Sequence, residues 1–312
     1  MIIGNVLVIG GTGFLGSHVV RQLAARGIRV RVPTRKRERA KGLILLPTVD
    51  VVEANVHDDA ALSRLMTSVD AVINLVGVLH GDFERAHVDL PCRIVAACRK
   101  GRIGRLLHVS ALGAAADAPS EYLRSKARGE AQVADAGGLG LDVTVVRPSV
   151  IFGPEDRFLN LFARLVRALP IVPLAAPQAR FQPVFVDDVA QVIVRALGEP
   201  RSFGQTYDLC GPRVYTLQDL VEYVGRTLGL NRAVLQLGPT LSYLQALVLE
   251  HLPGKLMTRD NLHSMQVDNV CACPFPSLFG IVPTPIEAIV PTYIGGVRPR
   301  SRYRWFRFRA RR

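Results

Sequence analysis

Short apolar runs alternate with stretches of helical periodicity through the first half of the chain. Runs of this kind, bounded by turn residues, are typical of strands buried on both faces of a parallel sheet. Six such strands are predicted, at Asn5–Ile9, Ile28–Val32, Val49–Val52, Ala71–Val76, Arg105–Val109 and Asp142–Val146. Helices are predicted between them at Ser17–Arg26, Asp59–Ser68, Pro91–Arg99 and Glu121–Ala136. The alternation predicts an α/β protein with a doubly wound parallel sheet.

The regular alternation ends after Pro148, where prolines become frequent. Strands are expected at Val184–Val186 and Thr206–Leu209, and helices at Asp187–Leu197 and Thr216–Leu228, whereas Gln236–Thr292 shows no clear period. The pattern predicts a smaller C-terminal α/β lobe, which would hold a substrate. The expected organisation is an N-terminal domain at residues 1–148 to which 183–212 return, a substrate lobe at 149–182 and 213–297, and a basic tail at 298–312.

Three regularly spaced glycines occupy the turn between the first predicted strand and the first helix, in Gly10-Gly11-Thr12-Gly13-Phe14-Leu15-Gly16. The first permits a tight turn, the second lets a pyrophosphate approach the backbone, and the third lets the helix pack closely on the sheet. The helix N-terminus offers free amides to phosphates. A plain strand–helix turn is the alternative, but the flanking strand and helix favour a Rossmann-type dinucleotide site. Its expected contacts are Gly10, Thr12, Gly13, Phe14, Leu15 and Gly16.

The end of the second predicted strand indicates which dinucleotide is bound. NAD sites usually carry a carboxylate there for the ribose 2′-hydroxyl. This chain has Thr34-Arg35-Lys36-Arg37 instead, and a guanidinium pairs well with a 2′-phosphate. Arg35 therefore favours NADP(H) over NAD(H), unless the segment is only a solvated basic loop. Asn55 and Val56 end the third strand region, where an adenine ring usually rests.

Composition refines this picture. The net charge is +13, and eight arginines lie in the last fifteen residues, interleaved with aromatic residues. Such a tail favours an anionic membrane surface. It gives only weak support for nucleic acid, because the fold offers no recognition motif. The five cysteines suggest no disulfide framework, and Cys271 and Cys273 are expected to be ordinary thiols rather than a metal site. The expected location is the cytoplasm, with peripheral association on the inner face of the membrane.

Several segments carry a family resemblance over about residues 5–230. They are the glycine loop, Asn74-Leu75-Val76-Gly77, Tyr122-Leu123-Arg124-Ser125-Lys126, Arg147-Pro148-Ser149-Val150-Ile151-Phe152-Gly153-Pro154, and the segment from Gln182 to Ala190. The chain resembles the extended and atypical short-chain dehydrogenases/reductases. In particular it resembles the branch that contains the NADPH-binding accessory subunit of respiratory complex I and its bacterial relatives. The resemblance implies cofactor contacts from Leu75, Val76, Gly77, Tyr122, Lys126 and Pro148.

The resemblance also identifies a candidate catalytic group. Tyr122 and Lys126 are four residues apart and would share a helix face, where an ammonium favours the phenolate. Ser110 would orient a substrate oxygen, but Ala111 stands where a second serine is common, which puts catalysis in doubt. No metal is expected: Asp187 and Asp188 are interpreted as helix caps, and His87 and His108 as structural.

Two functions therefore remain open. One is an NADP(H)-dependent oxidoreductase that acts on a small apolar or quinone-like substrate. The other is a non-catalytic NADPH-binding subunit that docks on a respiratory complex.

Overall fold

The computed structural model describes residues 3–137, 140–251 and 257–295. Its main feature is a seven-stranded sheet in the order β11-β6-β5-β4-β1-β2-β3, in which all neighbours are parallel. The strands are β1 (Asn5–Ile9), β2 (Arg29–Thr34), β3 (Val49–Glu53), β4 (Ala71–Asn74), β5 (Arg105–Val109), β6 (Asp142–Pro148) and β11 (Gln205–Leu209). The predicted doubly wound sheet and its six N-terminal strands are confirmed.

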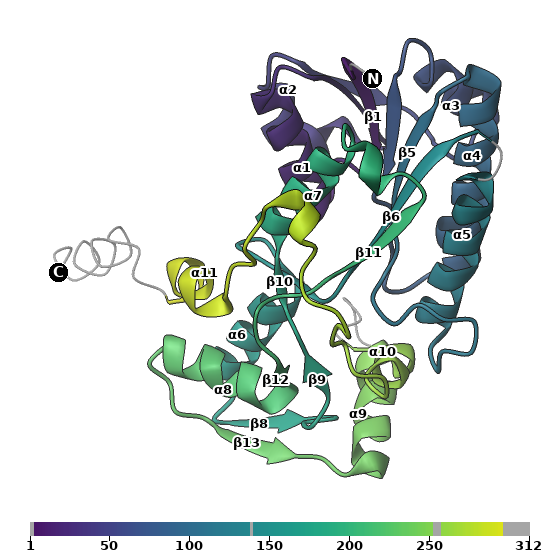
Figure 1. The fold of residues 1–312 in the computed structure, drawn as a ribbon. Coiled ribbons are helices and arrows are strands. Elements are labelled where there is room, and N and C mark those ends of the chain that lie inside the picture. The colour runs from purple at the N-terminus through teal and green to yellow at the C-terminus, as the bar shows by residue number, and fades with distance from the viewer. Residues whose placement is uncertain (1–2, 138–139, 252–256, 296–312) are drawn as a thin grey trace, which may run out of the picture.

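Helices cover both faces of the sheet (Figure 1). Because side chains alternate along a strand, Val6 and Val8 of β1 enter one core, and Leu7 and Ile9 enter the other. The first core contains α1 (Phe14–Ala25), α2 (Lys41–Ile44) and α7 (Val186–Ala196). The second contains α3 (Asp59–Leu65), α4 (Leu90–Gly101) and α5 (Glu121–Gly137). A π-helical turn, Arg85–Asp89, leads directly into α4.

The smaller lobe has an apolar core of its own, which confirms the second lobe expected from the sequence. Its helices are α6 (Phe158–Ala168), α8 (Leu217–Thr227), α9 (Pro239–His251), α10 (Arg259–Ser264) and α11 (Ile286–Tyr293). Its short strands are β7 (Ile151–Phe152), β8 (Ile171–Leu174), β9 (Arg180–Phe181), β10 (Val184–Phe185), β12 (Tyr215–Thr216) and β13 (Ala233–Gln236). They form the pairs β10-β7, β12-β9 and β13-β8. The strand expected at Val184–Val186 is thus only two residues long and pairs with β7, outside the main sheet.

The capping interpretation of Asp187 and Asp188 is wrong. Phe185 is the N-cap of α7, and no side chain caps that helix. Asp187 lies in the first turn, where its carboxylate bonds His18 Nδ1 on α1 at 2.6 Å. Asp188 accepts hydrogen bonds from the backbone amide and hydroxyl of Thr284. Both carboxylates therefore tie α7 to other segments, whereas the predicted cap at Thr216 is confirmed as a capping box.

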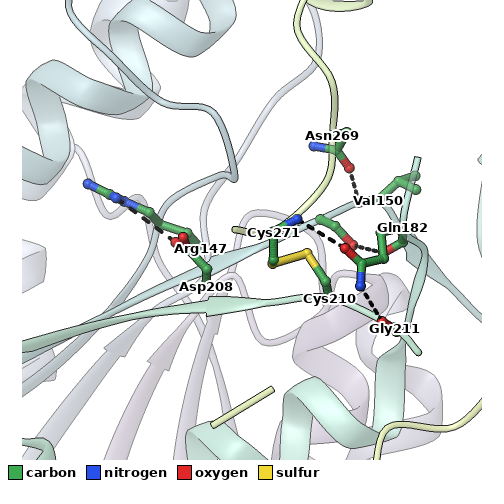
Figure 2. The surroundings of a disulfide bond; sticks show 9 residues. Arg147, Val150, Gln182, Asp208, Cys210, Gly211, Asn269 and Cys271 are labelled. Carbon is green, nitrogen blue, oxygen red and sulfur yellow. Dashed lines mark hydrogen bonds and ion pairs between the residues drawn. A yellow bond between two sulfur atoms is a disulfide. The ribbon is translucent and has the colours of Figure 1, made fainter. Parts of the chain in front are cut away.

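The expectation that Cys271 is an ordinary thiol is also wrong. Cys271 forms a disulfide with Cys210, which directly follows β11, and their Cα atoms are 6.0 Å apart (Figure 2). Gln182 accepts a hydrogen bond from the Cys271 amide and donates one to the Gly211 carbonyl, so the two chain segments are also joined by hydrogen bonds. Disulfides are rare in reducing compartments, so the cysteines no longer argue for one.

Candidate functional site

The glycine loop is tightly enclosed by backbone. Gly10 has φ +84°, and a Cβ there would lie 3.1–3.3 Å from the backbone of Leu75 and Val76. A Cβ on Gly16 would come within 2.2 Å of the Gly10 carbonyl oxygen, so only glycine allows α1 to approach the loop this closely. Gly13 is the N-cap of α1 and has no side chain to bond the first amides. These amides are therefore free of side-chain caps and suit a phosphate group.

Lys126 brings the ends of β4 and β5 together. Its buried Nζ donates hydrogen bonds to the carbonyl oxygens of Val76 and Val109, each at 3.1 Å. A Cβ on Gly77 would lie 3.2 Å from the same nitrogen. Burial lowers the pKa of Lys126 to about 8 against the opposing effect of Glu130, which leaves the amine mostly protonated at neutral pH. An ammonium has three donors, so one remains for a ligand.

Tyr122 shares α5 with Lys126, but among the described residues its phenol makes no hydrogen bond to the ammonium. Its ring packs edge-on against the rings of Phe83 and His87, with centroids 6.2 and 5.6 Å away. Among the described residues, its hydroxyl has no hydrogen-bond partner. Burial raises the pKa of the phenol to about 12, with no counteracting contribution from Lys126. The pKa reduction that the spacing predicts is therefore absent from this arrangement.

Two buried polar atoms near these strand ends lack partners among the described residues. They are the hydroxyl oxygen of Ser110, just after β5, and Nε2 of His108, in β5 itself. The other ring nitrogen of His108 lies 3.1 Å from the side-chain amide of Asn74. Buried polar atoms are usually hydrogen-bonded, so both atoms have an unmet capacity to form a hydrogen bond. Pro148 ends β6 beside them, and its carbonyl accepts from the Leu112 amide.

His87 fixes the loop that follows β4. Its Nε2 accepts from the Val78 amide at 3.0 Å, so Nδ1 carries the proton and donates to Ser125 Oγ at 2.8 Å. Ser125 in turn donates to the Tyr122 carbonyl. Burial, and next the charge of Lys126, lower the pKa of His87 to about 3. Hence the ring is neutral and serves as a fixed acceptor beside the loop Val76–Val78.

The adenosine end of the expected site lies at the edge formed by β2 and β3. Arg35 directly follows β2 and is exposed, and Asn55 follows the adjacent strand β3, where its side chain accepts from the His57 amide. Burial lowers the pKa of His57, and the charges of Arg85, Arg93 and Arg35 lower it further. Arg93 is paired with Asp59 at 2.6 Å, so the positive charge at this edge comes mainly from Arg35 and Arg85.

The structure places several of the predicted cofactor residues side by side. Gly10, Leu75, Val76, Gly77 and Lys126 adjoin one another, as the contacts above show. Phe14 packs at the junction of the lobes, where a Cβ on Gly153 would lie 3.2 Å from its ring. Sequence reasoning missed Arg85, because it lies in the π-helical turn before α4, which has no recognisable period. It also assigned His87 a general structural role without locating its contact to the Val78 amide.

These features define a protein of the NAD dependent epimerase/dehydratase family. The family's model matches residues 6–210, and the chain belongs to this family of dinucleotide-binding Rossmann proteins.

Among its relatives is the mitochondrial NADH dehydrogenase (ubiquinone) 1 alpha subcomplex subunit 9 of Mus musculus. It is 33% identical over 321 residues, which cover 96% of this chain and 81% of the mouse protein. A ceramide reductase of Caulobacter vibrioides is 33% identical over 196 residues, which cover 61% of this chain and 60% of the enzyme. Among solved structures, UDP-glucose 4-epimerase of Thermotoga maritima shares the fold with a TM-score of 0.72. It is 18% identical, and the alignment covers 95% of this chain and 99% of the epimerase.

Proposed function

We propose that this protein binds NADP(H) as a firmly held structural ligand and acts as a non-catalytic accessory subunit of an NADH:quinone oxidoreductase. The observation that carries the proposal is the bonding of Lys126. Its ammonium is held by two backbone carbonyls, while the Tyr122 phenol keeps a pKa of about 12. A dinucleotide can be bound by this arrangement, but the tyrosine is poorly prepared to exchange a proton at neutral pH.

The residues present fit a dinucleotide. The narrow turn at Gly10 and the uncapped start of α1 suit a pyrophosphate, and the third donor of Lys126 suits a ribose hydroxyl. Arg35, reinforced by Arg85, supports a preference for the 2′-phosphate. The long alignment with the mouse subunit supports the accessory role, since it extends through both lobes.

The experiment is to purify the protein with its natural partners and identify the dinucleotide released on denaturation. We expect NADP(H) in stoichiometric amount, slow exchange with added cofactor, and co-purification with the respiratory complex. A protein that exchanges its cofactor rapidly and is recovered apart from that complex would contradict the proposal.

A second function, reduction of an apolar carbonyl compound, is favoured by the unpartnered hydroxyl of Ser110. That hydroxyl could orient a carbonyl oxygen, to which Tyr122 would donate a proton as hydride arrives from the nicotinamide. The ceramide reductase relative supports a lipid-like substrate. Tyr122→Phe distinguishes the two functions, because it removes the proton donor and leaves Lys126 and the glycine loop unchanged. Turnover of long-chain ketones by the native protein that is lost in the variant would establish the enzyme; absence of turnover in both supports the accessory role.

A further inference from the structure

Helix α10 of the smaller lobe is bonded directly to the start of α5. The carboxylate of Asp260, in the first turn of α10, accepts hydrogen bonds from the backbone amides of Glu121 and Tyr122 at 2.7 and 3.1 Å. The first amides of a helix have no partner within it, and a carboxylate there also interacts favourably with the helix dipole. The position of α10 therefore influences the helix that carries Lys126.

The segment that follows α10 runs along the junction of the lobes. We call residues 265–271 the strap. The side chain of Val267 lies against Gly113, where a Cβ would be 3.8 Å from Val267 Cγ1. Gly113 comes three residues after Ser110, in the loop that follows β5. The strap thus lies beside the loop that holds the unpartnered hydroxyl.

Hydrogen bonds hold the middle of the strap on the smaller lobe. The amide of Asn269 donates to the carbonyl of Arg180, and its carbonyl accepts from the amide of Gln182, each at 2.9 Å. The side-chain oxygen of Asn269 accepts from the Val150 amide at 2.8 Å (Figure 2). Asp268 forms an ion pair with Arg180 at 3.3 Å, between two exposed side chains. The middle of the strap is therefore held mainly by Asn269.

The end of the strap is held by the disulfide. Cys271 is bonded to Cys210, and its amide donates to the side chain of Gln182 at 3.0 Å (Figure 2). Among the described residues, 272–275 form no hydrogen bond with the rest of the protein, although Phe275 packs against the core of the larger lobe. Cleavage of the disulfide would leave Cys271 attached by one hydrogen bond, so the strap would be free to move.

This disulfide is accessible to a thiol from one side. Cys210 is 3% exposed, whereas Cys271 is partly exposed and is followed by the exposed residues Ala272 and Cys273. A thiolate can therefore approach the sulfur of Cys271 from solvent. Cys273 is a free thiol two residues away, which is a further route for exchange. Exposed disulfides are the labile and regulatory ones, in contrast to buried structural bonds.

We propose that Cys210–Cys271 is a reversible redox switch: a dithiol reductant opens it, frees the strap, and so weakens the binding of the dinucleotide beside α5. One thiolate of the reductant attacks Sγ of Cys271, and the sulfur of Cys210 leaves as a thiolate. The second thiolate of the reductant then attacks the mixed disulfide and releases Cys271. The reductant becomes a disulfide, and its two electrons and two protons pass to the two cysteines. The switch rests on the proposed binding of NADP(H) but not on the accessory role.

The switch requires a reciprocal effect that a purely structural disulfide would not show. If reduction weakens NADPH binding by some factor, bound NADPH opposes reduction by the same factor. We expect a factor of about ten, which lies within the usual range for two coupled sites. A disulfide that only stabilises the fold would leave both quantities unchanged as long as the protein stays folded.

The test places the full chain in mixtures of reduced and oxidised dithiothreitol. The NADPH affinity, measured by fluorescence titration, should fall about tenfold on reduction. The ratio of reduced to oxidised dithiothreitol at half-reduction, measured by alkylation of Cys210 and Cys271, should rise by the same factor when NADPH is saturating. Hydrogen exchange should become faster in the strap and in the first turn of α5. Unchanged circular dichroism would show that the reduced protein is folded.

The matched control is Cys273→Ser, which removes the neighbouring thiol, keeps the disulfide and should respond to dithiothreitol like the native protein. Cys271→Ser should bind NADPH as weakly as the reduced protein and should not respond to the reductant. Asp260→Ala keeps the disulfide but removes the bonds to α5, so its NADPH affinity should already be low and change little on reduction.

The outcomes separate this switch from the proposed function. Equal NADPH affinity before and after reduction, an unchanged half-reduction ratio, or unchanged hydrogen exchange overturns the switch and leaves the proposed function standing. A native protein that binds no NADPH in either state contradicts the proposed cofactor and the switch with it. Recovery of the protein apart from the respiratory complex contradicts the accessory role alone, and a tenfold response to dithiothreitol would still support the switch.

Discussion

Protonation of two buried histidines should destabilise the protein in mild acid. His87 and His108 are 1% and 2% exposed, and burial is the largest cause that lowers each pKa to about 3. The folded state therefore binds fewer protons than the unfolded chain between pH 3 and pH 6.5. The stability that the two neutral histidines contribute is fully present above pH 6.5, and it is lost as the pH falls through this window. For His87 the loss has a structural reason, because a protonated ring cannot accept the Val78 amide.

The magnitude follows from the difference in pKa. At pH 5.0, each histidine costs about 2 kcal/mol relative to pH 7.5, since one pKa unit corresponds to about 1.4 kcal/mol. The carboxyls of Asp156, Asp188 and Asp208 have pKa values raised first of all by burial, and they oppose this trend. They are the same in any histidine variant, so their effect cancels in a comparison.

The assay is urea unfolding of the native protein and of His87→Gln at both pH values. The glutamine amide oxygen can still accept the Val78 amide, but it does not titrate. The difference in unfolding free energy between pH 7.5 and pH 5.0 should be about 2 kcal/mol smaller in the variant. His80→Gln, which changes an exposed histidine, is the control and should keep the native difference. An equal pH dependence in native protein and His87→Gln would refute the reasoning. NADPH affinity should also fall at pH 5.0 in the native protein, because the loop Val76–Val78 loses its support.

Three further predictions concern the loop, the cofactor and the disulfide. Gly13→Val should leave the protein folded but reduce NADPH binding below detection by calorimetry. The new Cβ would lie 3.2 Å from the Gly10 carbonyl oxygen, and the side chain would fill the phosphate space. Normal binding would disprove the placement of the loop. Arg35→Asp should weaken NADPH binding by roughly tenfold to a hundredfold, the worth of a charge-assisted bond, and leave NADH binding similar or tighter in fluorescence titrations. An unchanged ratio of the two affinities would count against Arg35. Cys271→Ser should lower the free energy of unfolding by about 2–4 kcal/mol, and dithiothreitol should lower it in the native protein but not in the variant. Insensitivity of the native protein to the reductant would argue against the disulfide with Cys210.

The strands were predictable because their signal is local. An apolar run such as Asn5–Ile9 can be recognised as a buried strand without knowing which strands lie beside it, and β1 has these same bounds. The start of α1 was placed three residues late, at Ser17 rather than Phe14, since the glycine loop continues into the first turn of the helix. Helix α9 gave no clear period, because its large apolar residues face outward and its buried residues are small.

Contacts between segments that are distant along the chain could not be predicted from the sequence. Cys210 and Cys271 are 61 residues apart, and they meet only because the segment around Asn269 pairs with the backbone of β9. The spacing of the cysteines along the chain therefore could not predict this disulfide. The bond from His87 to the Val78 amide likewise depends on how the π-helical turn packs on α5, where a Cβ on Gly129 would lie 1.7 Å from the His87 carbonyl oxygen.

The presence of a tyrosine and a lysine four residues apart does not by itself establish catalysis. Lys126 has a structural task that is independent of turnover, because its two donated bonds connect the ends of β4 and β5 beneath the cofactor loop. Tyr122 likewise packs edge-on against the rings of Phe83 and His87, so its ring has a packing role that does not require its hydroxyl. A protein that only stores a dinucleotide would need both side chains for these contacts. The hydroxyl of Ser110 has no hydrogen-bond partner among the described residues and so no such structural role. A hydrogen bond from this hydroxyl to a bound substrate would therefore be stronger evidence for an enzyme than the tyrosine and lysine are.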